Sequence, residues 1–385
     1  MRFAQLVERI GGDGADAWVT HYEAARALER GEDVILLSIG DPPLDTPASV
    51  IERAIERLRA GDTHYPPASG RPALRAALAQ LHQARSGQPT SAQNVVFFAG
   101  AQNALFAASL CLAGAGDEVI TFDPMYPTYP ATLTVSGAQL VRVPTDARFR
   151  PDLDALRAAV TARTRAIFYT SPGNPSGVVF NAAELATLGE LAEAHDLWLV
   201  SDEVYAGLAP GGHVPSLAAQ LPGRVVTLGS LSKSHAMSGW RTGWLVGPPE
   251  LAHHAEQLAM CMLFGLPPFI QEAVVTALAI APEAEQRIRD FCEARRRYLL
   301  ERLGDIQGLR VIEPGAGMFL LVDVSATGLT GAQFARELYA AERVSVLDGG
   351  AFGHCTAACV RVCFATDEAQ LDEACLRLRR FCRGR

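Results

Sequence analysis

The sequence predicts an α/β fold, with a large domain on a mostly parallel sheet and a smaller α+β domain. The chain has 385 residues, 49% of them hydrophobic, which is longer than one hydrophobic core usually serves. In its middle part, short apolar runs alternate with helical periodicity, a pattern typical of parallel strands joined by crossover helices. From about Pro282 the pattern changes. We therefore expect a large domain over residues 46–281, and a second unit formed by residues 1–45 and 282–385.

Seven apolar segments form the predicted sheet of the large domain. Each is short and bounded by turn residues, as expected for strands that are buried on both faces. Helical stretches between them, such as Ala101–Leu112 and Ala182–His195, are long enough to cross back over the sheet. The predicted strands are Asn94–Phe98, Glu118–Phe122, Gln139–Val143, Ala166–Thr170, Trp198–Ser201, Val225–Leu228 and Thr242–Val246.

The C-terminal part has the pattern of a separate α+β unit. Before Pro47, a sheet pattern is found only at Val34–Leu37, so we expect this N-terminal segment to pack on the C-terminal unit or on a partner chain. The C-terminal elements that we expect are a long helix over Glu283–Arg302, strands at Leu309–Ile312 and Met318–Asp323, and a closing helix from Asp367.

Charge and hydropathy exclude several classes of function. The 34 basic and 42 acidic residues give a formal charge of -8, and no long run of Lys or Arg offers a footprint for nucleic acid. No stretch of about 18 consecutive apolar residues predicts a membrane span. The N-terminus also lacks the pattern of a signal peptide. The sequence therefore predicts a cytoplasmic protein with no nucleic-acid or membrane partner.

The eight cysteines are scattered along the chain, with one cluster at Cys355, Cys359 and Cys363. The spacing in this cluster fits neither a zinc knuckle nor a thioredoxin-like pair. Free cysteine behaves as a small buried hydrophobe, and Val360, Val362 and Phe364 around the cluster suggest a strand. We therefore expect reduced thiols in the core and no metal site.

A candidate for covalent chemistry lies in Ser230-Leu-Ser-Lys-Ser-His-Ala-Met-Ser-Gly-Trp-Arg-Thr-Gly, just after a predicted strand. Ligands of open α/β sheets bind at this carboxyl edge. Lys233 in this position can form a Schiff base, while Ser230, Ser232 and Arg241 hold a phosphate. A loop lysine by itself is ordinarily a surface residue. Other motifs must therefore decide between the two interpretations.

Two further motifs follow predicted strands. Asp202, at the end of an apolar strand, can pair with a protonated pyridine nitrogen, and Tyr205 can hydrogen-bond a phenolic oxygen of the ring. Asn174, in the turn Ser-Pro-Gly-Asn-Pro-Ser-Gly, can donate to that oxygen and to a substrate carboxylate. Each motif also has a simpler interpretation. An acid such as Asp202 at a strand end is often a helix cap, and the turn around Asn174 is compatible with an ordinary connection between a strand and a helix.

A fourth motif runs from a strand into a helix at Gly100, Ala101 and Gln102. The backbone N–H groups of Ala101 and Gln102 are expected at a helix N-terminus, where phosphates bind. The motif is not the Gly-rich dinucleotide fingerprint, which argues against a nicotinamide enzyme. Tyr126, at another strand end, can stack on a flat cofactor, although simple packing explains it equally well.

In this order, the motifs resemble those of the class I and II aminotransferases, which have the aspartate aminotransferase fold, from about Leu37 to Cys363. The resemblance implies fold type I, with a mostly parallel seven-stranded sheet, and pyridoxal 5'-phosphate as the cofactor. It also implies a transaminase that moves an α-amino group from an amino acid to a 2-oxo acid, in an obligate homodimer with shared sites.

The resemblance assigns a role to each motif residue. For the cofactor it implies Lys233 as the Schiff-base lysine, Asp202 as the partner of the pyridine nitrogen, Tyr205 and Asn174 as ligands of the ring oxygen, Tyr126 as the stacking ring, and Ser230, Arg241, Ala101 and Gln102 as phosphate ligands. For the substrate it implies Arg361, in Cys-Val-Arg-Val-Cys-Phe, as the group that binds the α-carboxylate, and Gly40 as a lining residue. It further implies that Tyr65, in His-Tyr-Pro, reaches the phosphate bound by the neighbouring subunit.

The side-chain pocket is less well determined. Three stretches, around Leu231–Trp240, Met262–Gly265 and Ser345–Leu347, look most like those of the arginine:pyruvate transaminases. They suggest arginine or another basic or neutral amino acid as donor, and pyruvate or 2-oxoglutarate as acceptor. No motif supplies an arginine for a distal substrate carboxylate. Trp18 and Tyr22 are candidates to cover the substrate, but core packing accounts for both equally simply.

Three alternatives to a transaminase follow from the same residues. A carbon–sulfur β-lyase on the same fold shares every cofactor residue named above. A transcription regulator that senses an amine needs a DNA-binding module, and about 35 residues before the fold are too few for one. A nicotinamide enzyme lacks its glycine fingerprint here.

Overall fold

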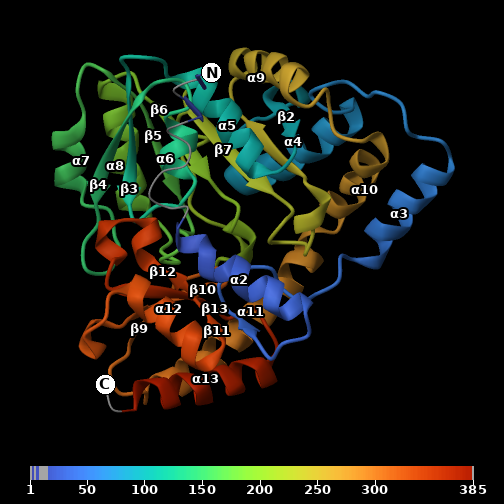
Figure 1. The fold of residues 1–385 in the computed structure, drawn as a ribbon. Helices are drawn as coiled ribbons and strands as arrows, with labels where there is room; N and C mark the ends of the chain where they lie inside the picture. Colours follow the sequence, from blue (N-terminus) through green and yellow to red (C-terminus); the bar gives the residue numbers. More distant parts are fainter. Residues whose placement is uncertain (1, 4–5, 8–15, 384–385) are drawn as a thin grey trace.

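The computed structural model describes residues 2–3, 6–7 and 16–383. Figure 1 shows a seven-stranded sheet flanked by helices, with the C-terminal elements packed at one end of it. Among the described helices, none combines the length and the hydropathy that a membrane span requires. The helices are α2 (Val19–Glu29), α3 (Ala48–Arg59), α4 (Pro72–Ser86), α5 (Ala101–Leu112), α6 (Tyr129–Leu133), α7 (Leu153–Ala159), α8 (Ala182–Ala194), α9 (Pro249–Met262), α10 (Pro268–Ala279), α11 (Ala281–Leu303), α12 (Gly331–Glu342) and α13 (Glu368–Cys382).

The large sheet confirms the seven predicted strands, with ends that differ by one or two residues. Its order is β2-β8-β7-β6-β5-β3-β4, and all neighbours are parallel except β8, which runs antiparallel to β2 and β7. The strands are β2 (Val95–Phe98), β3 (Glu118–Asp123), β4 (Gln139–Pro144), β5 (Thr164–Thr170), β6 (Trp198–Asp202), β7 (Val225–Ser230) and β8 (Gly243–Val246).

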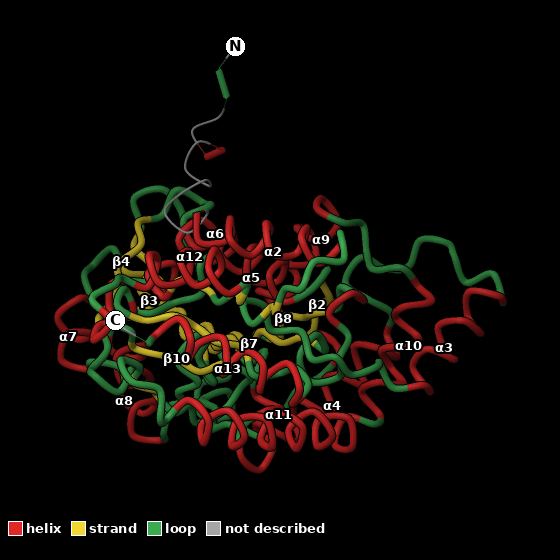
Figure 2. The backbone as a smooth tube through the Cα atoms, turned by 60° about the horizontal axis from the view of Figure 1, so that its bottom comes forward, coloured by secondary structure: helices red, strands yellow, loops and turns green. Residues whose placement is uncertain are grey.

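Both faces of this sheet are covered by helices, which explains why its strands are apolar throughout. Figure 2 shows α5, α6 and α9 on one side of the yellow strands and α4, α8 and α11 on the other. On the first side, Val96, Val200 and Leu228 pack with side chains from α5, α6 and α9. On the second side, Ile167 and Leu199 pack with α8.

The C-terminal part forms the predicted α+β unit. A four-stranded antiparallel sheet, in the order β12-β13-β10-β9, packs against α11, α12 and α13. The N-terminal segment joins this unit through β1, which pairs with β11, and through α2. Short 3-10 turns η1 (Asp16–Trp18) and η5 (Ser238–Trp240) border the site described below. The strands are β1 (Ile35–Leu36), β9 (Arg310–Ile312), β10 (Phe319–Asp323), β11 (Val344–Ser345), β12 (Leu347–Asp348) and β13 (Cys359–Cys363).

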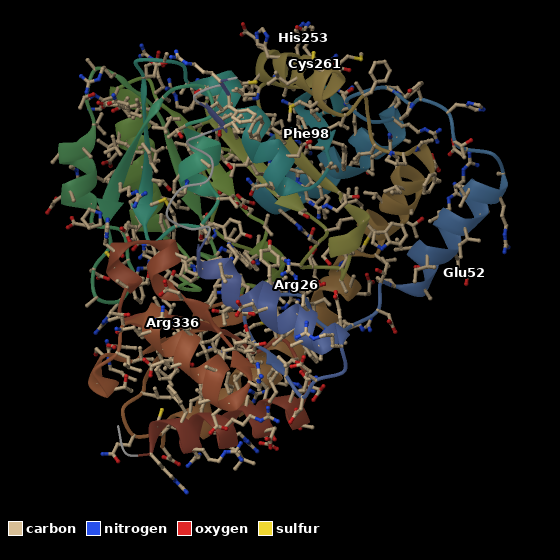
Figure 3. The ribbon with its side chains drawn as sticks, viewed as in Figure 1. Arg26, Glu52, Phe98, His253, Cys261 and Arg336 are labelled. Atoms are coloured by element: carbon tan, nitrogen blue, oxygen red, sulfur yellow. The ribbon has the colours of Figure 1, made fainter. Side chains whose placement is uncertain are left out.

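The expectation that the cysteines are core thiols needs a correction. Cys359 and Cys363 are buried in β13, as predicted, but Cys355 is exposed in a turn before that strand. Cys261 is also exposed, on the outer side of α9, where Figure 3 shows it near the molecular surface. Hydropathy alone does not place these two residues, because each lies in an element whose other face is buried.

Candidate active site

A cavity of about 250 Å³ lies where β5, β6 and β7 end. Thr170, Asp202 and Ser230 are the last residues of these three neighbouring strands, so their side chains meet at one edge of the sheet. Phe319 of β10 closes the cavity from the C-terminal unit. The predicted site residues that line it are Trp18, Gly40, Ala101, Gln102, Tyr126, Asn174, Asp202, Tyr205, Ser230, Ser232, Lys233, Arg241 and Arg361.

Lys233 is the only lysine in the sequence. It follows β7 by three residues, and its Nζ donates a hydrogen bond to the carbonyl oxygen of Gly40 at 2.7 Å. Burial lowers the pKa of this amine, and the nearby cations Arg361 and Arg241 lower it further, whereas Asp41 opposes them. The chain's single ε-amine is therefore held in a cavity that favours its neutral, nucleophilic form.

The Asp202 carboxylate is held by two donors. The hydroxyl of Tyr129 lies 2.6 Å from Oδ2, and the backbone N–H of Val204 lies 3.2 Å from Oδ1. Tyr129 also contacts the hydroxyl of Thr170 at 2.8 Å. Burial raises the pKa of Asp202, while these two hydrogen bonds lower it. Because burial holds the pKa of Tyr129 well above its ordinary value, this phenol stays protonated and donates to the carboxylate.

Arg361 joins the two halves of the cavity. Its Nη1 donates to Oδ1 of Asn174 at 2.9 Å, and its Nη2 donates to the carbonyl oxygen of Ser38 at 2.6 Å. Nδ2 of Asn174 in turn points to the hydroxyl of Tyr205, at 3.4 Å. Burial also raises the pKa of Tyr205, so its hydroxyl is a donor. One hydrogen-bonded row therefore runs from β13 across the cavity to the end of β6.

The guanidinium of Arg361 is fully buried between two aromatic rings. Its central carbon lies 3.9 Å from the ring centre of Phe319 and 4.9 Å from that of Phe352. Both of its protein acceptors are neutral, and its Nε has no hydrogen-bond partner among the described residues. A buried cation without a counterion is costly, so this site is suited to an anionic ligand.

A second anion-binding feature is the N-terminus of α5. Ala101 and Gln102 are its first residues, and the first N–H groups of a helix have no partner within the helix. The side chain of Gln102 is already engaged, since its amide donates to Thr132 at 2.8 Å and accepts from Thr128 at 2.9 Å. The backbone amides of Ala101 and Gln102 are therefore the groups available at this end of the cavity.

Arg241 stands at the same end, and Gly100 makes room for it. Its Nη1 donates to the carbonyl of Ser238 at 2.8 Å, and its Nη2 to that of Ala99 at 3.3 Å. Gly100 does not line the cavity. It has φ of +92°, and a Cβ added there would lie 2.6 Å from Nη2 of Arg241. Gly100 thus has a steric role beside Arg241, and its place in the cofactor site stays a prediction.

Ser230 and Ser232 fix the turn that carries Lys233. The Ser230 hydroxyl lies 2.8 Å from that of Ser232 and 2.9 Å from the carbonyl oxygen of Thr242, and the backbone N–H of Ser232 donates to it at 3.0 Å. Both hydroxyls are buried at the edge of the cavity. The two serines line the same cavity as Ala101, Gln102 and Arg241.

Four further aromatic residues named from the sequence fall in different places. Tyr126 lines the cavity and contacts Tyr129 edge-on, with 6.4 Å between ring centres. Trp18 of η1 also lines the cavity, whereas Tyr22 is 58% exposed. Tyr65 is 85% exposed and lies outside the cavity, with its ring 4.9 Å from that of Phe264.

Several cavity residues or their supports were not predicted, among them Tyr129, Thr170, Phe319 and Phe352. Tyr129 donates to Asp202 and contacts Thr170, and the rings of Phe319 and Phe352 lie against Arg361. A usable signal existed for Tyr129, because it lies three residues after Tyr126 at the start of a short helix, where both rings can face the same side. Phe352 comes from a turn with no recognisable pattern.

Comparisons with known proteins identify the family. The sequence model of the class I and II aminotransferases matches residues 32–378. An arginine–pyruvate transaminase from Pseudomonas aeruginosa is 48% identical, over 98% of this chain and 97% of that protein. An aspartate/prephenate aminotransferase from Thermus thermophilus is 34% identical, over 93% of this chain and 94% of that protein.

Solved structures agree with the sequence comparison. The aspartate aminotransferase of Thermus thermophilus with maleate superposes with a TM-score of 0.93 and 31% identity, covering 99% of this chain and 100% of that one. An aspartate aminotransferase from Thermotoga maritima gives a TM-score of 0.92 and 28% identity over similar coverage. The predicted fold is thus confirmed. The chain belongs to the class I and II aminotransferases, enzymes that transfer an amino group from an amino acid to a 2-oxo acid.

Proposed function

We propose that this aminotransferase carries pyridoxal 5'-phosphate on Lys233 and takes arginine, or another basic or neutral amino acid, as its donor. The acceptor is a 2-oxo acid such as pyruvate or 2-oxoglutarate. The observation that carries the proposal is the position of the chain's single lysine. Lys233 stands between a phosphate-binding end, with Arg241 and the α5 N-terminus, and the buried, unpaired Arg361.

The residues present fit this cofactor. Backbone amides of Ala101 and Gln102, the hydroxyls of Ser230 and Ser232, and Arg241 would hold its phosphate. The clearance that Gly100 leaves for Arg241 supports this placement. Tyr126 would stack on the ring. When bound, pyridoxal 5'-phosphate supplies an aldehyde for the amino group and a ring that accepts electrons from the α-carbon.

Lys233 has two roles in the proposal. Its Nζ, whose neutral form burial favours, would hold the aldehyde carbon of the bound cofactor covalently, with loss of water. When a donor amino acid occupies the site, this amine would be the base that takes the proton from the donor's α-carbon. The 2.7 Å hydrogen bond to the Gly40 carbonyl holds the amine at the substrate end of the cavity.

Arg361 and Asn174 orient the substrate. The guanidinium binds the α-carboxylate through Nε and one terminal nitrogen, which is the bidentate geometry that arginine offers. The rings of Phe319 and Phe352 fix its plane and exclude water. Binding an anion here supplies the missing counterion, so the same contact stabilises the buried cation.

Asp202 and Tyr205 would raise the capacity of the cofactor ring to accept electrons. The Asp202 carboxylate, which accepts hydrogen bonds from Tyr129 and the Val204 N–H, would pair with a protonated pyridine nitrogen of the bound cofactor. The Tyr205 hydroxyl, which Asn174 approaches, donates to the phenolic oxygen. Together they favour the ring as an acceptor of negative charge.

The lining of the cavity bears on the donor. Its three cationic residues, Lys233, Arg241 and Arg361, each have a role above, which leaves no lining cation for a distal carboxylate among the described residues. Trp18 and the 43% exposed Ile39 also line the cavity and offer apolar surface to a long side chain. The relative that is 48% identical is named for arginine and pyruvate, which favours arginine as the donor.

The enzyme is proposed to act as a homodimer. Tyr65 is 85% exposed beside Phe264 and does not line the cavity of its own chain. Further exposed apolar side chains lie on α3, namely Ile51, Ile55 and Leu58. An exposed apolar surface of this kind marks a contact site. The partner is a second copy of the chain, whose phosphate Tyr65 would reach.

A donor screen tests the proposal. Purified, cofactor-saturated enzyme is incubated with each amino acid and either pyruvate or 2-oxoglutarate, and the new amino acid is measured. We expect conversion with arginine that requires the acceptor, and much slower conversion with aspartate. Formation of pyruvate and ammonia from cystathionine without an acceptor would instead identify a β-lyase, and faster turnover of aspartate than arginine would overturn the donor assignment.

A further inference from the structure

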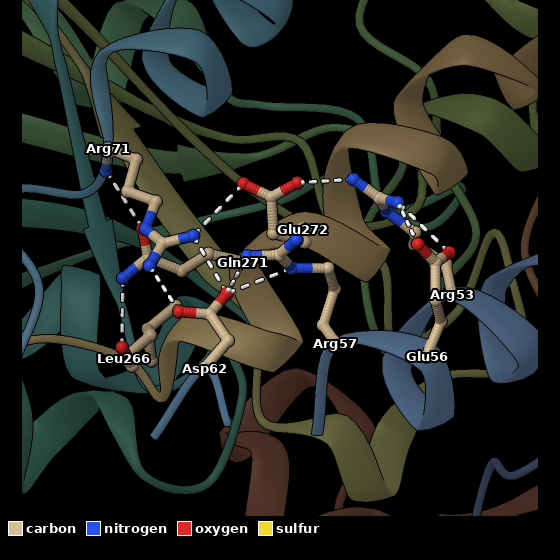
Figure 4. A network of polar contacts seen from close by, with 8 residues as sticks. All are labelled: Arg53, Glu56, Arg57, Asp62, Arg71, Leu266, Gln271 and Glu272. Atoms are coloured by element: carbon tan, nitrogen blue, oxygen red, sulfur yellow. Dashed lines mark hydrogen bonds and ion pairs between the residues drawn. The ribbon is translucent and has the colours of Figure 1, made fainter. Parts of the chain in front are cut away.

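Tyr65 lies in a loop whose two ends are joined by an ion pair. The loop connects α3 to α4 over residues 60–71. Nη2 and Nη1 of Arg71 donate to the two carboxylate oxygens of Asp62, at 2.5 and 2.9 Å, and Nε of Arg57 adds a contact of 3.2 Å (Figure 4). Two parallel hydrogen bonds between a guanidinium and a carboxylate fix both the distance and the relative orientation of the two groups. The loop is therefore closed at its base, as in an Ω-loop.

The start of α10 holds the same arginine. Nη1 of Arg71 donates to Oε1 of Glu272 at 3.1 Å, and its backbone N–H donates to Oε1 of Gln271 at 2.8 Å. The amide of the buried Gln271 donates in turn to the carbonyl oxygen of Leu266 at 2.8 Å. Arg71 is thus bound to the loop on one side and to the segment that carries Phe264 on the other (Figure 4).

The loop and that segment also touch directly. A Cβ added to Gly265 would lie 3.3 Å from the carbonyl oxygen of Pro67 and 3.4 Å from the ring of Pro66. Further along the loop, the Ser69 hydroxyl donates to Glu256 of α9 at 2.7 Å. The loop is therefore held by contacts at its base and along its second half, while Tyr65 is exposed.

The ion pairs are better shielded than ordinary surface pairs. The side chain of Asp62 is 9% exposed, and those of Arg71 and Glu272 are 26% and 21% exposed. The hydrogen bond from Arg71 is the main cause that lowers the pKa of Asp62, so the carboxylate is ionised throughout the neutral range. Salt therefore screens these contacts less than it screens exposed pairs.

We propose that Asp62, Arg71 and Glu272, here called the clasp, are positioning residues for Tyr65. The clasp presents the Tyr65 hydroxyl, already ordered, to the phosphate end of the cavity in a second copy of the chain. This inference rests on the proposed homodimer and its shared cofactor site. Ordering the loop in advance removes the entropy that its immobilisation on binding would otherwise cost.

The test is a double-mutant cycle on cofactor affinity. Apoenzymes of Tyr65→Phe, Asp62→Asn and the double variant are titrated with pyridoxal 5'-phosphate by quenching of tryptophan fluorescence. Dimer dissociation is followed separately by sedimentation. Removing a hydrogen bond to a charged group is expected to weaken cofactor binding about tenfold in Tyr65→Phe. Asp62→Asn is expected to weaken it about threefold, and to have less than a twofold further effect in the Tyr65→Phe background.

Glu56→Gln is the matched control. Glu56 accepts from Arg53 in the same array of charges, at 3.0 Å, but its side chain is 63% exposed and it is linked to the clasp only indirectly, through the 2.8 Å hydrogen bond from Arg53 to Glu272. We expect unchanged cofactor affinity for this variant. If Asp62→Asn does not fold, Arg71→Lys, which keeps the charge and loses the fork, should give the same threefold effect.

The possible outcomes distinguish the positioning role of the clasp from the cofactor site shared between subunits. Full cofactor affinity in Asp62→Asn and Arg71→Lys, with Tyr65→Phe impaired, overturns the clasp and leaves the shared site intact. Additive losses in the double variant also overturn it, because Asp62 would then act by another route. Full affinity in Tyr65→Phe overturns both the shared site and the clasp.

Discussion

The hydroxyl of Tyr129 donates to Oδ2 of Asp202 across 2.6 Å, and this contact joins α6 to the end of β6. Thr170, the last residue of β5, lies 2.8 Å behind the same hydroxyl. The carboxylate is therefore oriented by a residue 73 positions away in the sequence. Burial raises the pKa of Asp202, and the hydrogen bond from Tyr129 is the larger of the two that oppose this rise.

Tyr129→Phe should slow turnover about tenfold, since one hydrogen bond to a buried charge is lost. The hydrogen bond lowers the pKa of Asp202, so its removal raises that pKa. The acidic limb of the kcat/KM profile should then move to higher pH. Thr170→Val is the control for packing and should have a smaller effect on the rate. An unchanged pH profile in Tyr129→Phe would show that the hydroxyl does not act through Asp202.

Arg361→Lys should raise KM for both the amino acid and the 2-oxo acid, by about tenfold or more, because the lysine ammonium cannot replace the bidentate fork. The cofactor's visible absorbance should be retained, because Lys233 is unchanged, and any shift of its maximum would report the lost hydrogen bond from Arg361 to Asn174. Steady-state kinetics with both substrates, alongside the spectrum, check this. Equal KM values in variant and parent would remove Arg361 from the substrate site.

Gly100→Ala should weaken cofactor binding. The backbone at Gly100 has φ of +92°, which costs a side-chain-bearing residue about 1–3 kcal/mol, and the new Cβ would crowd Nη2 of Arg241. The expected loss is about tenfold or more in affinity, measured by titration of the apoenzyme. Gly223→Ala is a suitable control, because a Cβ there meets no atom within 4 Å. Full affinity in Gly100→Ala would contradict the steric role.

The sequence reveals one part of the site and hides another, for a physical reason. Lys233 and Asp202 stand at ends of apolar strands, and parallel neighbours in a sheet bring such ends together, so local pattern suffices to pair them. Arg361 and Asn174 are 187 residues apart and meet only because the C-terminal unit packs against the large sheet. No local signal encodes that packing. The family resemblance, rather than periodicity, placed Arg361.

The outer surface is predicted least well. Tyr65 follows α3 in a loop without periodicity, and the base of this loop is held by the pairing of Asp62 with Arg71 and of Arg71 with Glu272 of α10, far along the chain. Cys261 is exposed for a related reason, since it lies on the outer side of an amphipathic helix. Periodicity identifies such a helix, but its rotation is fixed by tertiary packing.

The acidity of Lys233 can be measured directly, because the chain has no other lysine. Apoenzyme labelled with ¹³C-lysine should give a single side-chain resonance. Burial lowers the pKa of this amine, so the resonance should titrate at a pH below 10.5, and the neutral amine should predominate at lower pH than in a free lysine. Unfolding the protein in urea should return the midpoint to about 10.4. A native midpoint at or above the unfolded one would contradict the proposed base.

The covalent bond to Lys233 is tested most directly by reduction with borohydride. The cofactor-saturated enzyme is reduced and digested, and the peptides are identified by mass spectrometry. With one ε-amine in the chain, the account predicts a single pyridoxyl-modified peptide, Lys233 as its modified residue, and loss of the modification in Lys233→Ala. Absence of any adduct at residue 233, or an adduct confined to the N-terminal amine, would contradict it.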